Sequence, residues 1–121
     1  MKTTFQQISI RKDCSLQHAL KQMDEINRKL LIVLNENDSF FSLLSIGDIQ
    51  RAIIRNLPLN TRVSEIVRQD ITVARSEDNL EKVKQRMKIR RNEFMPVINS
   101  QNQVIDVIFW EDLFEEKRST L

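Results

Sequence analysis

The second half of this 121-residue chain repeats the first, and no other feature constrains its fold as strongly. Shifting the chain against itself until Leu16 falls on Leu80 aligns like residues without a gap from residue 15 onward. The aligned pairs include Met23 with Met87, Val33 with Val97, Leu34 with Ile98, Asn35 with Asn99, Leu43 with Val107, Leu44 with Ile108 and Asp48 with Asp112. Because the period is longer than that of solenoid repeats, each copy is interpreted as half of one domain.

Both copies predict the same order of elements. A short β-branched run, at 8–10 and again at 71–73, predicts a first strand. An amphipathic helix follows, and its inner face carries Leu16, Ala19, Leu20, Met23 and Ile26 in the first copy and Leu80, Val83 and Met87 in the second. Apolar runs joined by polar turns then predict hairpins, at 30–34 with 40–44 and at 94–98 with 104–109. A final helix is expected at 45–55 and at 111–117. The pattern is βαββα twice, an α/β (α+β) fold.

The boundary between the copies is expected near Pro58, which gives repeats at 1–59 and 60–121 of one compact module. The segment TRVSEI after it predicts a short, capped helical turn. We expect the two halves to pack about a pseudo-twofold axis.

Composition excludes several classes of protein. Apolar residues make up 40% and charged residues 30%, as in soluble globular domains, and no apolar run is long enough for a bilayer, so the cytoplasm is the expected location. Cys14 and His18 are each the only residue of their type, which leaves no disulfide and no zinc ligand set. There is no nucleophile–base set and no phosphate loop, so we expect no catalytic residues and no enzyme.

Basic residues gather in the second copy, where Lys84, Lys88 and Arg91 lie beside the apolar stripe of the expected helix. The pattern favours a solvated helix face. A face that recruits phosphate groups is the alternative, but a net charge of +2 is too small to favour nucleic acid as a partner.

The single glycine, Gly47, lies between Ser45 and Asp48 at the expected start of a helix. Ser45 and Asp48 predict a capping box, which alone would explain both residues. Glycine inside a first helical turn costs about 1 kcal/mol relative to alanine, so it indicates close approach of another group, either a packed strand or a ligand phosphate or ribose at the helix N-terminus.

The chain resembles a tandem pair of CBS domains, also called a Bateman module. The resemblance rests on the duplicated βαββα order, on MPVIN at 95–99 and on LLSIGDIQRAI at 43–53. It implies a regulatory module that binds an adenosine nucleotide, AMP, ADP or ATP, between the repeats, with no required cofactor or metal. It also implies a homodimer and a controlled enzyme, expected as a further C-terminal domain.

The resemblance also implies residue roles. Asp48 would hold ribose hydroxyls and Ser45 a phosphate, beside Gly47. Asp112 retains the acid of the second copy, but Phe109 replaces the hydroxyl, and Ser42 and Asp106 replace a small residue that is usually glycine, which could crowd the clefts. The remaining nucleotide-binding candidates are Ser9 and Thr72 beside the adenine, Ile32, and Pro96, for which a role as an edge-strand residue is the alternative.

Two further interpretations stay open. The sequence SIGDIQRAIIRNLPLNTRVSEI is similar to CBS pairs that precede sugar-phosphate nucleotidyltransferase domains, although Gln50 stands where those carry an arginine. Alternatively, Phe109 or Trp110 could fill the second cleft. The pair would then bind no ligand and would serve only for dimerisation or assembly.

Overall fold

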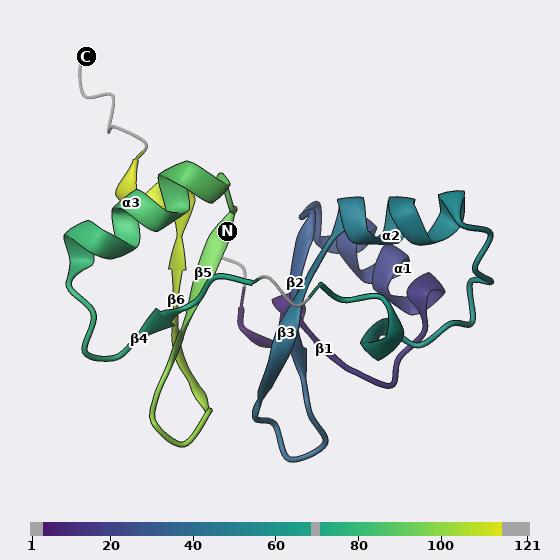
Figure 1. Ribbon diagram of the computed structural model, residues 1–121, viewed down its shortest axis with the longest axis horizontal. Coiled ribbons are helices and arrows are strands. Elements are labelled where there is room, and N and C mark those ends of the chain that lie inside the picture. The colour runs from purple at the N-terminus through teal and green to yellow at the C-terminus, as the bar shows by residue number, and fades with distance from the viewer. Residues whose placement is uncertain (1–3, 69–70, 115–121) are drawn as a thin grey trace.

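The computed structural model describes residues 4–68 and 71–114, which form two three-stranded mixed sheets with helices on their outer sides (Figure 1). The first repeat contains η1 (Gln6–Ile8), β1 (Ser9–Arg11), α1 (Leu16–Ile26), β2 (Leu30–Leu34), β3 (Phe40–Ser45) and α2 (Ile46–Ile54). After η2 (Val63–Glu65), the second repeat contains β4 (Ala74–Arg75), α3 (Leu80–Arg90), β5 (Phe94–Ile98), β6 (Val104–Phe109) and α4 (Trp110–Leu113). The predicted duplicated α/β fold is confirmed.

The two sheets have the same topology. β1 runs parallel to β2, which pairs antiparallel with β3, and β4, β5 and β6 repeat this arrangement. Each hairpin carries an irregularity at the same place, between Val33 and Leu34 and between Val97 and Ile98. The parallel pair in each repeat is joined by a helix, as a crossover connection requires.

The central strand β2 is buried on both faces because it separates two apolar layers. Leu30, Ile32 and Leu34 face the second sheet and share a core cluster with Phe94 and Ile98. Leu31 and Val33 point the other way and pack under the helices of the first repeat. The alternation follows from the two-residue period of a strand, so the two repeats share one continuous core.

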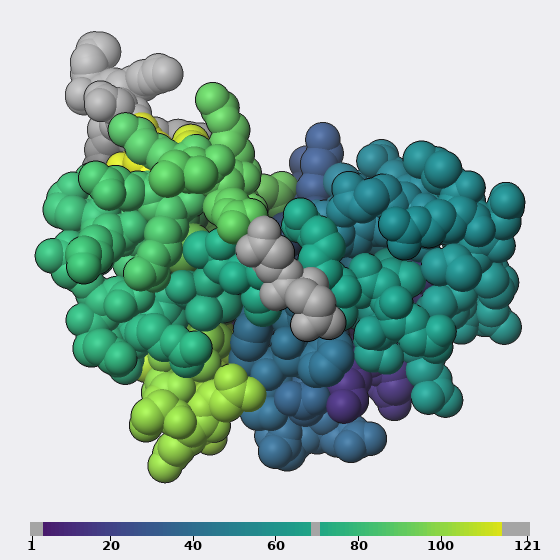
Figure 2. Space-filling view, viewed as in Figure 1, coloured from purple at the N-terminus to yellow at the C-terminus, as the bar shows by residue number. Residues whose placement is uncertain are grey.

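Polar contacts also join the repeats. Phe40 and Asn102 exchange bonds at the hairpin tips: the Phe40 amide donates to the Asn102 carbonyl at 2.9 Å, and the Asn102 side-chain amide donates to the Phe40 carbonyl at 2.8 Å. Figure 2 shows the two tips side by side, in blue and yellow-green. At another point, the Lys29 amide donates to the Glu93 carboxylate at 3.0 Å, and Arg28 pairs with Glu111 at 3.1 Å.

Several local predictions need correction. The strand expected at 71–73 is displaced to Ala74–Arg75, because the earlier residues pack against the shared core without joining the ladder. Leu80 is 54% exposed at the start of α3, whereas Val83 and Met87 are buried as expected. The turn at Val63–Glu65 has no side-chain cap, since the Thr61 hydroxyl donates to the Pro58 carbonyl instead. The last helix is described only as far as Leu113, and the part expected at 115–117 lies outside the described residues.

The segment around η2 packs against the first repeat. Val63 is fully buried in the helix-side core of that repeat, and its amide donates to the Cys14 carbonyl at 2.8 Å. The Ser64 amide donates to the Lys12 carbonyl at 2.9 Å. This segment therefore brings Arg68 next to the start of α2.

Candidate ligand-binding cleft

The predicted capping box at the start of α2 is confirmed. The Ser45 hydroxyl accepts from the Asp48 amide at 3.2 Å, and the Asp48 carboxylate accepts from the Ser45 amide at 2.9 Å through Oδ2. Ser45 is the N-cap and has an extended backbone, which is the usual conformation for that position.

Two arginines bind the other oxygen of Asp48. Arg51, one turn further along α2, places Nη2 at 2.5 Å from Oδ1, and Arg68 places Nε at 2.8 Å from the same atom. The Asp48 side chain is fully buried, whereas both arginine side chains are about half exposed. A buried carboxylate requires such partners. The Asp48 carboxylate is thus held by the protein itself, and two guanidinium groups around one carboxylate leave one positive charge in excess.

Gly47 has room for a side chain in this structure. A Cβ built there would lie 3.5 Å from Arg51 Nη1 and 3.6 Å from Ser45 Oγ, which are ordinary van der Waals distances, and its φ is not positive. The group beside the glycine is the Arg51 guanidinium. Neither Arg51 nor Arg68 was singled out from the sequence. An ion pair that joins residues 48 and 68 has no periodic signal that could have revealed it.

The other predicted site residues lie in different surroundings. Ser9 and Ile32 are direct partners in the first sheet, and Ile32 is fully buried in the shared core. The Ser9 hydroxyl donates to the Phe5 carbonyl at 2.9 Å. Thr72 is half-buried in the segment before β4, and Pro96 is buried in β5 opposite Val107.

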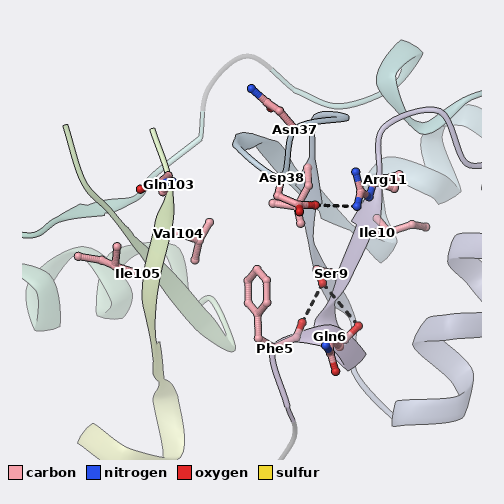
Figure 3. A pocket seen from close by; sticks show the side chains of 11 residues that line it. Phe5, Gln6, Ser9, Ile10, Arg11, Asn37, Asp38, Gln103, Val104 and Ile105 are labelled. Carbon is pink, nitrogen blue, oxygen red and sulfur yellow. Dashed lines mark hydrogen bonds and ion pairs between the residues drawn. The ribbon is translucent and has the colours of Figure 1, made fainter. Parts of the chain in front are cut away.

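Asp112 of α4 lies at a cavity of about 430 Å³ between the repeats. Its walls are formed by Phe5, Ile8, Val104, Ile105, Asp106, Val107, Phe109 and Asp112. A second hollow of about 600 Å³ adjoins it and shares Phe5, Val104 and Ile105. In the view of that hollow, the Phe5 ring stands between β1 and β6, and Ser9 bonds to its backbone (Figure 3).

Residues 109–112, the second motif, correspond to residues 45–48 of the first repeat, the first motif. The aromatic residues of the second motif leave this cavity open. Phe109 forms one wall and packs against Phe94, with ring centroids 5.6 Å apart and the two rings tilted by 60°. Trp110 turns toward Phe114, 4.2 Å away between centroids, in the core cluster under α3. The sequence allowed either ring to fill the cleft of the second repeat. In the structure neither Phe109 nor Trp110 fills the cavity beside Asp112. Phe5 was not foreseen as a wall residue because it precedes the first predicted strand.

The charge around the two motifs is opposite. Asp106 and Asp112 are the charged residues among those that form the cavity of the second motif, and Asp106 accepts from the Val107 amide at 2.8 Å. Nearby, burial is the largest single influence on Glu111 and raises its pKa. The hydrogen bond and the charge of Arg28, together with a hydrogen bond from the Glu111 backbone, outweigh burial and hold the pKa of Glu111 below its usual value. The first motif has surplus guanidinium groups and the second has surplus carboxylates.

The described residues contain neither a metal-binding cluster nor a membrane-spanning helix. Within residues 4–68 and 71–114, no group of three or more His, Cys, Asp and Glu side chains could hold a metal ion. No helix in this part of the chain is long and apolar enough to cross a bilayer.

Comparison with known proteins identifies the fold. Residues 63–119 match the model of the CBS domain family. No curated protein matches the chain in sequence. The CBS domains of a transcriptional regulator from Streptococcus pneumoniae superpose with a TM-score of 0.77 at 15% identity, covering 96% of this chain and 94% of that one.

Two similar structures contain ligands. The CBS domain protein PAE2072 from Pyrobaculum aerophilum, complexed with AMP, has a TM-score of 0.73 at 16% identity, with 91% and 85% of the chains covered. The CBS domain pair of protein MJ0100, in complex with 5′-methylthioadenosine and S-adenosyl-L-methionine, has a TM-score of 0.71 at 20% identity, with 93% and 86% covered. At such identities the likeness shows the fold, which is that of a tandem CBS domain pair.

Proposed function

We propose that this chain, which has the fold of a tandem CBS domain pair, is a regulatory module that binds an adenosine derivative between its repeats. The observation that carries the proposal is the cavity of about 430 Å³ at the second motif. It lies between β6 and residues 5–8, it has two aromatic walls, and it is within the size range of small-molecule sites.

The similar structures support the class of ligand. PAE2072 is complexed with AMP, the MJ0100 domain pair with 5′-methylthioadenosine and S-adenosyl-L-methionine, and CbpB with c-di-AMP. Adenosine is common to all of these. In our proposal, the ring of Phe5 or Phe109 packs against the base, and the Asp112 carboxylate accepts hydrogen bonds from ribose hydroxyls.

The first motif is a second candidate binding site, but it would bind a ligand through its arginines rather than through its aspartate. A ribose could reach the Asp48 carboxylate only by displacing Arg51 or Arg68, since its oxygens are bonded to Ser45 and to both arginines. The surplus guanidinium charge there would suit a phosphate, so AMP, ADP or ATP remains a candidate for this motif.

The finer assignments are also proposals. Bound ligand would modulate an enzyme, either fused after the second repeat or bound as a separate chain, and a sugar-phosphate nucleotidyltransferase fits the resemblance of residues 45–66. The repeats would extend over 1–59 and 60–121. Two modules would pair as a homodimer.

Ligand binding is tested by thermal unfolding with adenosine, AMP, ADP, ATP and S-adenosylmethionine. A ligand at a hundred times its dissociation constant stabilises the folded state by about 2.7 kcal/mol. We expect at least one compound to raise the Tm. The Asp112→Ala variant, which alters the cavity of the second motif, should lose this increase in Tm. Asp24→Ala, an exposed acid on α1, serves as the matched control. If no compound shifts the Tm at millimolar concentration, the proposal fails.

A ligand-free assembly module is the rival function, and one surface favours it. The end of α2 and the loop after it expose four large apolar side chains: Ile53, Ile54, Leu57 and Leu59. Ile54 is 77% exposed, which is unusual for isoleucine unless a partner covers it. We expect a dimer by light scattering and a monomer for Ile54→Lys. A dimer that persists in that variant would exclude this surface as the interface.

A further inference from the structure

We infer that the cavity of the second motif accepts adenosine derivatives without a phosphate group, neutral or cationic at the 5′ position. The inference rests on the proposed function and narrows its ligand class. It follows from the side chains that form the cavity.

The described residues that form the walls of this cavity provide no side-chain hydrogen-bond donor. Apart from Asp106 and Asp112, the described residues that form it are all apolar: Phe5, Ile8, Val104, Ile105, Val107 and Phe109. A phosphate group needs donors or cations to replace the water that it loses. Here it would meet two carboxylates instead, and Phe109 occupies the N-cap position without a hydroxyl.

The arginines described around this region are already paired. Arg28 lies over the outer wall, 4.9 Å from the Phe109 ring centroid, and binds Glu111. Arg11, at the adjoining hollow, pairs with Asp38 at 2.6 Å (Figure 3). It also donates to the Glu36 carbonyl at 2.7 Å. Recruiting either guanidinium to a phosphate would break bonds that the protein already makes.

The same surroundings suit an uncharged or positively charged ligand. The Phe5 and Phe109 rings and the aliphatic wall can cover a base and a thioether, which are largely apolar. Asp106 and Asp112 are both exposed, so a sulfonium or ammonium group beside either carboxylate gains a modest, salt-sensitive attraction that a phosphate would lose as repulsion. The carboxylates thus select for ligand charge rather than only for ribose.

The test is calorimetric titration of the full chain with S-adenosylmethionine, 5′-methylthioadenosine, AMP and ATP, followed by competition between them. We expect the two compounds without phosphate to bind at least tenfold more tightly than AMP and ATP, and AMP to displace neither. Asp106→Asn should weaken S-adenosylmethionine about three- to tenfold and leave 5′-methylthioadenosine within twofold. Asp24→Asn is the control, and circular dichroism checks folding.

The outcomes separate the two proposals. AMP that displaces 5′-methylthioadenosine with equal or higher affinity would overturn the inference and leave the proposed function intact. Unchanged S-adenosylmethionine affinity in both Asp106→Asn and Asp112→Asn would also overturn it. If none of the four compounds binds, the proposed function itself fails.

Discussion

Asp48 and Arg68 are twenty positions apart in the chain, and Arg68 Nε lies 2.8 Å from Oδ1 of the fully buried Asp48 carboxylate. The ion pair fastens the segment after η2 to the start of α2. The Ser42 hydroxyl adds a bond to the Arg68 carbonyl at 3.4 Å. In this way the connection between the repeats is anchored on the motif that the resemblance assigns to the ligand.

We expect Arg68→Ala to lower the free energy of unfolding by about 1–2 kcal/mol, because Asp48 keeps only Arg51 as a cationic partner. Urea unfolding measures the effect. Arg55→Ala, at an exposed residue just after α2, is the matched control and should change stability by less than about 0.5 kcal/mol. Equal effects of the two substitutions would mean that the Arg68 ion pair contributes nothing.

Replacements in the capping box should have opposite signs. Ser45→Ala removes the acceptor of the Asp48 amide and should destabilise by about 1 kcal/mol. Gly47→Ala should stabilise by about 0.5–1 kcal/mol, because the added Cβ makes ordinary contacts at a helical position. Thermal unfolding of both variants measures these changes. A destabilising Gly47→Ala would show that the turn needs the space beside Arg51.

Glu111 should make the contact between the repeats sensitive to acid. Its pKa is lowered in the folded state, so the stabilisation by Arg28 is fully present above the ordinary value of 4.5 and is lost as pH falls through the folded-state pKa. Glu111→Gln should therefore cost about 0.5–1 kcal/mol at pH 7 and progressively less below pH ~4. Unfolding of both proteins from pH 3 to 7 gives the comparison. A difference that is constant across this range would contradict the assignment.

Phe94→Ala should be the most destabilising of these changes, by about 3–5 kcal/mol, because the fully buried ring packs between the sheets and against Phe109. Phe94→Leu, which keeps most of the volume, should cost less. Urea unfolding is followed by Trp110 fluorescence, which reports on the second repeat, and by circular dichroism, which reports on the whole chain. A small effect of Phe94→Ala would mean that the shared core collapses around the missing ring.

The elements that repeat in the sequence could be predicted, because their signals are local. The hairpins, α1, α3 and the capping box at Ser45 all depend on periodicity or on side chains within one turn, and each is found where expected or within two residues. The position of β4 was wrong because only two residues there pair with β5, and pairing between distant segments leaves no mark in a short apolar run.

The candidate site was harder to predict for the same reason. The resemblance directed attention to Asp48, and nothing nearby in the sequence shows that Arg68 returns to bind it. The sequence left open whether Phe109 fills the cleft at the second motif, and in the structure Phe109 packs back on Phe94 and leaves space beside Asp112. Which wall a ring lines depends on packing across the two sheets, which a single sequence does not record.

The doubly buried strand β2 makes the two repeats depend on each other for solubility. If the second repeat were cut away, the face of β2 that carries Leu30, Ile32 and Leu34 would become an open apolar sheet, the kind of surface that promotes aggregation. The protein should consequently unfold in a single cooperative transition. A compound bound in the cavity beside Ile8 would contact the core cluster that the two repeats share, so its binding would also change how firmly the repeats are held together.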